Sequence, residues 1–381
     1  MRIAHLANFY GPRSGGLRTA MHALGAGYRA RGHEVLLVVP GARDAVEATP
    51  WGTRVTLRSP VLPRTGGYRA ITRLTEVRDV LAAFAPDVLE VSDRTTLRPL
   101  GDWAREARIP SVFFAHERMD GVLRANLAPL WAGSTPVLRA IDAHNRSTHR
   151  RFDVVACTTD FAAAEFRRLG LPTVTVPLGV DLERFHPRRH DPAIRDLLAC
   201  DDEALVVLAS RLSREKAPEL AIEAIRVLNQ HGRRVRLVVA GTGALEPALR
   251  RRAADLPVDF LGFVDNAERF AALLASADAV VAPGPIETFG LAALESLASG
   301  TPVVAHAESA LPEVIGNAGV AVRGTPGDMA AGLLAVLGRD PSARRAAARA
   351  RAETMPWRAT VATMEALHER ALTGVRVGER A

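Results

Sequence analysis

Short apolar segments alternate with amphipathic helical segments along the whole chain. Helical spacing is clear, for example, in residues 19–31 and 219–230. Strands that alternate with helices form βαβ units with parallel sheets, and fully apolar strands fit sheets covered on both faces. The pattern therefore predicts an α/β fold with doubly wound sheets. The expected strands are residues 3–7, 35–39, 88–91, 111–115, 154–157 and 174–176, followed by 205–209, 236–240, 258–261, 279–282 and 302–305.

The length and a local shift in composition predict two domains. A chain of 381 residues exceeds the usual size of a single core. Pro and Gly at 177–181 precede a charged stretch, which is typical of a linker. We expect Rossmann-like domains at residues 1–178 and 179–356, with a helix at about 357–381 that packs back onto the first. Two such domains facing across a cleft would bind ligands at the carboxyl ends of their strands.

The composition excludes several classes of protein. Hydrophobic residues make up 48% and charged residues 24%, which is ordinary for a globular protein. No apolar run reaches the roughly 18 residues of a membrane-spanning helix, and the first residues lack a signal-peptide pattern. Cys157 and Cys200 are the only cysteines, so neither a disulfide framework nor a Cys-rich metal site is indicated. The expected compartment is a reducing cytoplasm.

The positive charge is concentrated in the first half of the chain. Residues 1–178 contain 24 Arg against 16 Asp and Glu, a net +8, within a total of +7. Such a field attracts anions, and an anionic phospholipid or glycolipid at the inner face of the cell membrane would match it. The helices expected at 19–31 and 135–150 are the candidate contact surfaces. The alternative is a basic solvated face. With 5% aromatic residues, no nucleic-acid surface is expected, and the oligomeric state is not predicted.

Lys216 is the only lysine among 49 basic residues. An ammonium is a compact point charge, whereas a guanidinium is a flat fork. A lysine retained in so arginine-rich a chain therefore indicates a role that arginine does not fill. Arg211 lies five positions earlier, and both residues follow the apolar run 204–209, where a fork and a point charge would suit two neighbouring phosphates. The alternative is that one lysine persisted by chance at a helix start.

The segment after the apolar run 279–282 has the features of an anion site. Thr288 is expected to cap a helix that begins near Phe289. The first amides of a helix point at a bound anion. The amides expected to do so are those of Phe289, Gly290 and Leu291.

Two glutamates flank this helix start. Glu287 precedes it and Glu295 lies two turns inside, so the order of a sugar, a diphosphate and a ribose fits the segment. Taken alone, Glu287 is more simply a helix N-terminal charge and Glu295 a solvated helix residue. The strand-end positions of Arg211 and Lys216 favour the binding site.

Several weaker signals lie at other strand ends. The pair Gly15 and Gly16 would let backbone approach a ligand. His116 follows the run 111–115, where it could bond a substrate hydroxyl or polarise a reacting centre. The loops at 241–243 and 262–264, with Val264, suit backbone contacts to a nucleobase. An ordinary glycine turn or a structural histidine remains the alternative for each.

These features together resemble the retaining GT-B glycosyltransferases of family 4, over nearly the whole chain. The resemblance rests on Arg211-x4-Lys216, on Glu287-x7-Glu295 with its Phe-Gly-Leu core, and on the glycine pair and His116 segment. One departure is Ala217, since many members have glycine after the lysine. The segments 7–20, 89–94, 115–118 and 282–285 are similar to actinobacterial GDP-mannose-dependent α-mannosyltransferases, including the phosphatidylinositol mannoside mannosyltransferases.

The resemblance implies transfer of a hexose, mannose from GDP-mannose, to a hydroxyl of a phosphatidylinositol mannoside or another glycolipid. The leaving phosphate would help to deprotonate the acceptor, and preorganised donors would stabilise the developing charge. There is no Asp-x-Asp, so no essential metal and no cofactor beyond the nucleotide sugar are expected. The implied contacts are Arg211, Lys216, Gly16 and the amides after Thr288 with the diphosphate, Glu287 and His116 with the donor sugar, and Glu295 with the ribose.

Other functions remain open from the sequence. A transferase of the same family could use a UDP- or other NDP-sugar with a soluble acceptor. A nucleotide-sugar epimerase of the same fold would need no acceptor, and a PLP-dependent phosphorylase would need Lys216 for its Schiff base. A non-enzymatic anion-binding protein would leave the donor intact.

Overall fold

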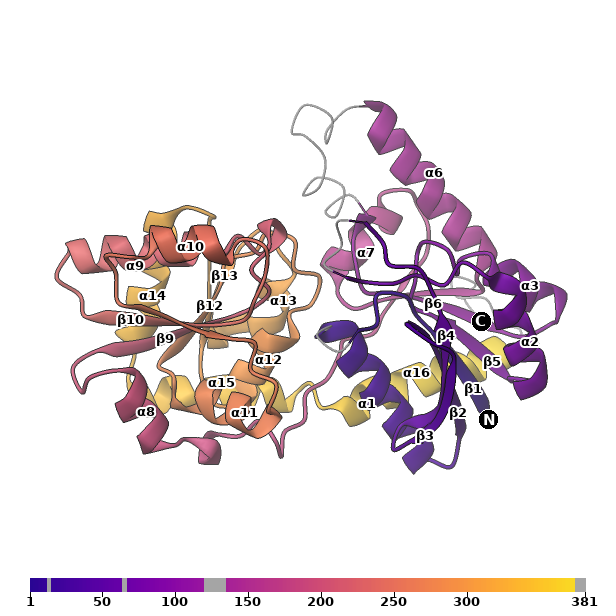
Figure 1. Cartoon of the computed structure of the whole chain (residues 1–381), viewed down its shortest axis with the longest axis horizontal. Helices are drawn as coiled ribbons and strands as arrows, with labels where there is room; N and C mark the ends of the chain where they lie inside the picture. The colour runs from indigo at the N-terminus through magenta and orange to yellow at the C-terminus, as the bar shows by residue number, and fades with distance from the viewer. Residues whose placement is uncertain (12–14, 64–66, 120–134, 374–381) are drawn as a thin grey trace. The chain divides into compact units, whose positions relative to one another are not determined.

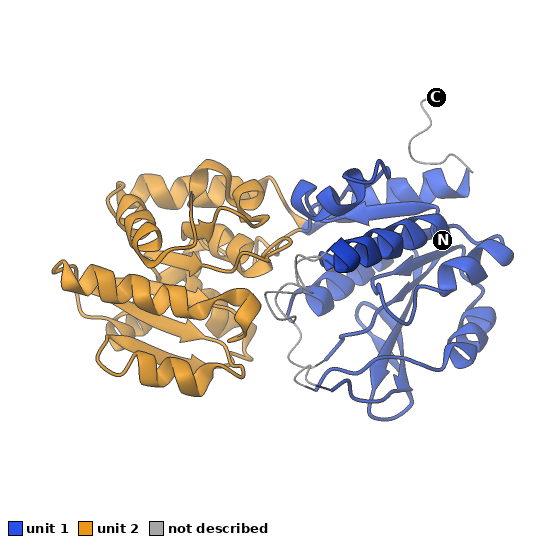
Figure 2. Cartoon of the chain, turned by 90° about the horizontal axis from the view of Figure 1, so that it is seen from above, with its two compact units in different colours: residues 1–178, 357–381 blue, residues 179–356 orange. Residues whose placement is uncertain are grey.

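The computed structural model describes residues 1–11, 15–63, 67–119 and 135–373, which form two compact units (Figures 1 and 2). Unit 1 consists of Met1–Leu178 together with Trp357–Ala381, and unit 2 of Gly179–Pro356. Each unit contains one sheet with helices on both faces (Figure 1). Residues 374–381 of the helix expected at 357–381 lie outside the described residues.

Unit 1 is built on an eight-stranded sheet in the order β3-β4-β2-β1-β5-β6-β7-β8. All pairs are parallel except β3 with β4. The strands are β1 Arg2–Leu6, β2 Glu34–Gly41, β3 Ala45–Thr49, β4 Gly52–Arg58, β5 Val88–Val91, β6 Ser111–Ala115, β7 Val154–Cys157 and β8 Val174–Thr175. The helices are α1 Gly16–Ala30, α2 Leu74–Phe84, α3 Leu100–Glu106, α6 Thr135–Arg151, α7 Asp160–Arg167 and α16 Trp357–Leu372.

Unit 2 is built on a six-stranded parallel sheet in the order β11-β10-β9-β12-β13-β14. The strands are β9 Ala204–Ala209, β10 Val235–Ala240, β11 Val258–Gly262, β12 Ala279–Ala282, β13 Val303–His306 and β14 Val320–Val322. The α-helices are α8 Pro192–Leu198, α9 Pro218–Gln230, α10 Glu246–Arg252, α11 Ala267–Ser276, α12 Leu291–Ala298, α13 Leu311–Ile315, α14 Pro326–Leu337 and α15 Pro341–Glu353. Short 3₁₀ turns are η1 Pro187–Arg189, η2 Arg214–Lys216 and η3 Gly316–Ala318.

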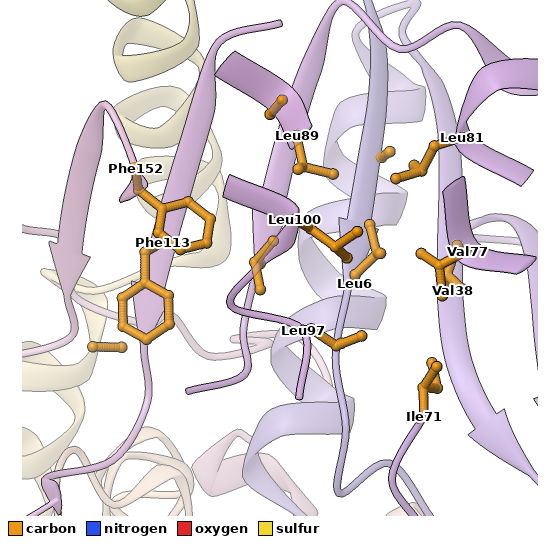
Figure 3. Packing of buried hydrophobic residues seen from close by; sticks show 14 of the residues in the cluster. Leu6, Val38, Ile71, Val77, Leu81, Leu89, Leu97, Leu100, Phe113 and Phe152 are labelled. Carbon is orange, nitrogen blue, oxygen red and sulfur yellow. The ribbon is translucent and has the colours of Figure 1, made fainter. Parts of the chain in front are cut away.

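Alternate strand positions form the core on one face of the sheet of unit 1 (Figure 3). Leu6, Leu89 and Phe113, from three neighbouring strands, pack with Leu81 of α2 and Leu100 of α3. Burying each of these side chains stabilises the fold by roughly 1.5–3 kcal/mol. Because strand side chains alternate between faces, the intervening positions of β1 and β5 belong to the opposite face.

The predicted pair of doubly wound, Rossmann-like sheets is confirmed, and each expected apolar segment is a strand within two residues of its predicted ends. Three strands were missed. β3 and β14 are sheet edges, and β4 alternates buried with exposed positions. Such strands pack on a single neighbour or a single face, so their sequences contain no continuous apolar run.

The C-terminal helix α16 packs against α1 in unit 1. The two helices approach closely at Gly27, where a Cβ would lie 2.4 Å from Cγ2 of Val361. On one side of this contact, Glu365 of α16 pairs with Arg31 and with Nε2 of His33. The absence of a side chain at position 27 therefore sets the distance between α1 and α16.

We expect Gly27→Ala to lower the free energy of unfolding of the chain by about 1–3 kcal/mol, because the added methyl overpacks the helix contact. Val361→Ala makes room for that methyl, so the double variant should lose less stability than the sum of the two single variants. Urea unfolding of the four proteins tests this. Additive losses would show that α1 and α16 do not depend on this contact.

Candidate active site

The site in unit 2 lies where the order of the sheet reverses. β9 and β12 are neighbours there, with Val207 opposite Val280, and doubly wound sheets bind ligands beyond the carboxyl ends of strands at such a point. Lys216 follows β9 and Glu287 follows β12. Their side chains form an ion pair, with Nζ 2.5 Å from Oε2 and exposed fractions of 17% and 24%. The fold thus joins two residues that are 71 positions apart.

Local backbone geometry brings the two loops together. Lys216 ends the turn η2, and Ala217 has a left-handed φ of 44° before Pro218 begins α9. Many family members have glycine at this position. Ala217 adopts the same left-handed conformation that glycine favours, which costs an alanine about 1–2 kcal/mol. A Cβ on Gly284 would lie 3.0 Å from both the Glu215 carbonyl oxygen and Cα of Lys216, so glycine there permits the close approach.

Arg211 has a partner that the sequence analysis missed. Its Nη2 lies 3.2 Å from Oε1 of Glu215, which also accepts a hydrogen bond of 2.5 Å from Ser213 Oγ. Burial acts to raise the pKa of Glu215, but the Ser213 hydrogen bond and the charges of Arg211 and Lys216 outweigh it and lower the pKa. The ionised Glu215 therefore orients a guanidinium that is otherwise half exposed.

The predicted helix start near Phe289 with a Thr288 cap is wrong. α12 begins at Leu291, and its N-cap is Gly290, with a φ of 85° and no side-chain cap hydrogen bond. The turn is instead determined by packing, since a Cβ on Gly290 would lie 2.3 Å from Cδ2 of Leu311. The Glu287 carbonyl also accepts a hydrogen bond from the Ala310 amide. The amides of Phe289 and Gly290 therefore precede the helix rather than form its first turn.

Glu295 is a half-buried residue of α12, not a fully solvated one. Burial raises the pKa of its carboxyl to about 7, against the opposing charge of Arg184. Glu295 is therefore not a fully solvated helix residue, and its contact with a ribose stays a prediction.

The loops after β10 and β11 continue the same edge of the sheet. The Thr242 carbonyl accepts a hydrogen bond from the Leu212 amide, and a Cβ on Gly241 would lie 1.9 Å from the Ser210 carbonyl oxygen. The loop after β10 therefore packs directly on the segment that carries Arg211. Val264 is partly buried and lies just beyond β11, which is the edge strand next to β10.

In unit 1 the sheet order reverses between β1 and β5. Gly15 is the N-cap of α1 and Gly16 is its first residue, while residues 12–14 of the same loop lie outside the described residues. His116 directly follows β6, and its Nε2 lies 3.1 Å from Ser92 Oγ. Burial lowers the pKa of His116 to about 3, so the ring is neutral at physiological pH.

A cluster of titratable side chains inside unit 1 was also missed. Glu90 is fully buried and accepts a hydrogen bond of 2.6 Å from the Tyr28 hydroxyl. Nδ1 of His5 lies 3.1 Å and Nε2 of His368 2.7 Å from its oxygens. His5 and Glu90 interrupt apolar strands at directly paired positions. A polar residue in each of two apolar runs was the available signal, but only the pairing register shows that they meet.

In the part of the chain that the structure describes, no group of three or more His, Cys, Asp or Glu side chains is arranged to hold a metal ion. The expectation of transfer without an essential metal or further cofactor stays a prediction.

Family models match both units. Residues 15–179 match the glycosyl transferase 4-like domain, and residues 191–353 match the glycosyl transferases group 1. The chain belongs to the GT-B glycosyltransferases of this group. It is 46% identical over 382 aligned residues to the GDP-mannose-dependent alpha-(1-6)-phosphatidylinositol dimannoside mannosyltransferase of Mycobacterium tuberculosis, with 100% of this chain and 99% of that protein covered. The predicted family is confirmed, and the enzyme is a glycosyltransferase rather than an epimerase or a phosphorylase.

Other relatives are more distant. A GDP-mannose-dependent alpha-mannosyltransferase of Corynebacterium glutamicum is 28% identical, covering 80% of this chain and 72% of that protein. A sucrose-phosphate synthase structure from Thermosynechococcus elongatus superposes with a TM-score of 0.78 at 21% identity, covering 98% and 99% of the two chains. The glycosyltransferase WaaG superposes with a TM-score of 0.70 at 19% identity, covering 99% and 100%. These two structures support the fold.

We expect Glu295→Gln to change stability in a pH-dependent way. A raised carboxyl pKa stabilises the folded state fully below about pH 4.5, and this contribution is lost as the pH rises through about 7. The variant, which stays neutral, should exceed the wild type by less than about 1 kcal/mol at pH 5 and by up to about 3 kcal/mol at pH 8. Denaturant unfolding at the two pH values measures this, with Glu268→Gln on α11 as the exposed control. An equal difference at both values would contradict the raised pKa.

Proposed function

We propose that the protein transfers mannose from GDP-mannose to a hydroxyl of a phosphatidylinositol mannoside, with retention of anomeric configuration. The observation that carries this proposal is the full-length 46% identity to the M. tuberculosis enzyme, whose name specifies both that donor and a phosphatidylinositol dimannoside acceptor. The C. glutamicum relative, also named for GDP-mannose, supports the same donor. The contacts in unit 2 are consistent with a sugar diphosphate.

The ion pair between Lys216 and Glu287 would present both charges to the donor. An ammonium has three donors, and Glu287 Oε2 accepts one of them. The remaining N–H groups are then available for the diphosphate, while Oε1 of Glu287 can accept a hydrogen bond from a sugar hydroxyl. Arg211, held by Glu215, would bind the neighbouring phosphate with its planar fork.

The same arrangement would stabilise the transition state. Negative charge grows on the leaving diphosphate as the glycosidic bond breaks, and preorganised cations and amides act most strongly where charge develops. We assign this role to Lys216, Arg211 and the amides at Phe289 to Leu291. The leaving phosphate would then accept the proton of the acceptor hydroxyl.

The remaining contacts in this proposal follow from the hydrogen-bonding groups that each residue offers. Glu295 would accept hydrogen bonds from the ribose hydroxyls, and the backbone near Val264 would contact the base. In unit 1, Gly15 and Gly16 would leave backbone accessible to the diphosphate. His116, which is neutral, would contact the donor sugar near the reacting carbon.

For the acceptor, we propose that the protein works at an anionic lipid surface at the cytoplasmic face of the membrane. The net +8 of residues 1–178 supports this electrostatically. Arg139, Arg146 and Arg150 are exposed on α6. No helix among the described residues is long and apolar enough to cross a membrane.

The proposed donor and acceptor are tested together with purified protein. We expect transfer from GDP-mannose, but not from UDP-glucose or ADP-glucose, to phosphatidylinositol dimannoside presented in anionic vesicles. Mass spectrometry of the lipid and NMR of the new anomeric centre report product and configuration. Transfer from a UDP-sugar, or only to a soluble acceptor such as an inositol phosphate, would replace this function with the alternative from the same family.

We expect Lys216→Ala to lower kcat/KM by about 10²–10³, as for the loss of one charged transition-state contact. Lys216→Arg should restore less than a tenth of the lost activity, because a guanidinium fork does not fit the position of a point charge against Glu287. Steady-state kinetics with GDP-mannose measure both variants.

Arg214→Ala is the matched control for these variants. It removes a cation from the same 3₁₀ turn, but the side chain is exposed and takes no part in the proposed site. Its activity should stay within about twofold of the wild type. Full activity of Lys216→Arg would show that position 216 requires only a positive charge.

A further inference from the structure

Arg98 is a cation that pairs with no carboxylate in the described part of the chain. It lies in the loop between β5 and α3, and its side chain contacts two residues of α6. Nη1 lies 2.5 Å from Nδ1 and 3.2 Å from Nε2 of His144, and Nη2 donates a hydrogen bond of 2.9 Å to Ser147 Oγ. No step of the proposed reaction uses these three side chains.

The arginines whose charges act on Arg98 have carboxylate partners of their own. Arg94 forms an ion pair of 2.8 Å with Glu165, and Arg151 forms one with Asp102. Burial lowers the pKa of Arg98, and the charges of Arg151 and Arg94 act in the same direction. The nearby carboxylates oppose this lowering and do not outweigh it. The charge of Arg98 is therefore unfavourable in its surroundings, and a bound anion would stabilise it.

His144 and Ser147 hold the guanidinium without cancelling its charge. Burial, together with the charges of Arg98 and Arg94, lowers the pKa of His144 to about 4, so the ring is neutral at physiological pH. A neutral imidazole and a hydroxyl accept hydrogen bonds but supply no negative charge. Because Ser147 Oγ accepts from Arg98, its own proton can be donated to another oxygen.

The guanidinium also has N–H groups that no described residue uses. It has five such groups, and the contacts with His144 and Ser147 use at most three of them. Nε is buried and has no hydrogen-bond partner among the residues that the structure describes, which is unfavourable for a donor. All three side chains are partly exposed, so an anion can reach the cluster from solvent. A phosphate group would supply both the missing charge and several acceptor oxygens, and its geometry matches the arginine fork.

The position of Arg98 relates the cluster to the acceptor. β5 and β6 are neighbours, and Arg98 and His116 follow them at the edge of the sheet where such folds bind ligands. His144 and Ser147 lie on α6, the helix whose exposed arginines we assign to the lipid surface. The cluster is therefore built from elements that also carry the proposed sugar contact and the proposed membrane contact.

We propose that Arg98, held by His144 and supported by the Ser147 hydroxyl, binds the phosphodiester of the acceptor lipid. The inference rests on the proposed function for the identity of that acceptor, since a phosphatidylinositol mannoside contains one phosphodiester beside its inositol. The phosphate site itself is a property of unit 1 and does not depend on the donor.

The test is calorimetric titration of the full-length protein with glycerophosphoinositol, the water-soluble headgroup. Saturating GDP is present throughout, so that the cations of unit 2 are occupied. We expect the wild type to bind glycerophosphoinositol and to show no binding of myo-inositol, which lacks the phosphate. Arg98→Gln should weaken binding about 10- to 100-fold, as for the loss of a charged hydrogen-bonding partner, and Ser147→Ala about three- to tenfold. Should Arg98→Gln fail to fold, Ser147→Ala decides the question by itself.

Arg105→Gln is the matched control. Arg105 lies on α3 in the same unit, but its guanidinium already faces a carboxylate, that of Asp102 at 3.7 Å, and it is 52% exposed. Its loss should change the affinity for glycerophosphoinositol less than twofold. An equal loss of affinity in Arg105→Gln and Arg98→Gln would show a general effect of net charge and overturn the site.

Kinetics separate binding of the acceptor phosphate from a merely structural role. In Arg98→Gln, KM for phosphatidylinositol dimannoside in vesicles should rise at least about tenfold, while kcat and KM for GDP-mannose change less than twofold. A variant that is only less well folded would lose kcat with both substrates instead, and that result would contradict the proposal.

The proposal is overturned if wild-type protein saturated with GDP does not bind glycerophosphoinositol, or if Arg98→Gln binds it as tightly as the wild type. If inorganic phosphate binds as tightly as glycerophosphoinositol, the cluster is a general phosphate site and its assignment to the acceptor is wrong. If the wild type transfers no mannose to any phosphatidylinositol mannoside, the proposed function fails, while the titrations still decide whether Arg98 binds the headgroup phosphate.

Discussion

The ion pair between Lys216 and Glu287 is the contact on which the site in unit 2 depends. It joins the loops after β9 and β12, the two strands between which the sheet order reverses, and its members are mostly shielded from water. Loss of one partner of such a shielded pair destabilises the fold, because the other charge is left without a partner. The close approach at Gly284 and the left-handed Ala217 shape the two loops for this contact. The pair therefore ties the geometry of the site to the stability of the loops that form it.

The two sheets differ in the side chains that lie where the strand order reverses. In unit 2 the loops after the strands carry Lys216 and Arg211, each paired with a carboxylate, and the amides before α12. In unit 1 the corresponding region lies between β1 and β5, and the neutral His116 follows the next strand, β6. Under the proposed function the two regions have different tasks, because a leaving diphosphate is stabilised by positive charge, whereas a sugar hydroxyl can be bound by a neutral hydrogen-bond partner.

The strands at the centre of each sheet were predictable because they are buried on both faces and consist of uninterrupted apolar residues. β3, β4 and β14 were not, since half-exposed and edge strands tolerate polar residues. The prediction of a helix cap at Thr288 was wrong for a related reason. Thr288 has the local propensity of a cap, but the packing of Gly290 on Leu311 places the start of α12 two residues later than predicted. Local preferences of about 1 kcal/mol are easily outweighed by such packing.

The amino-acid sequence by itself determined the α/β class, the family and the residue types of the site, because apolar periodicity and short motifs are local properties of the chain. Only the tertiary structure decided which of those residues meet. The pairing of Lys216 with Glu287, of Arg211 with Glu215, and of His5 with Glu90 depends on strand order and register. Strand order and register are set by long-range packing of the sheets, and a contact between residues 71 or 85 positions apart leaves no local periodic signal in the chain.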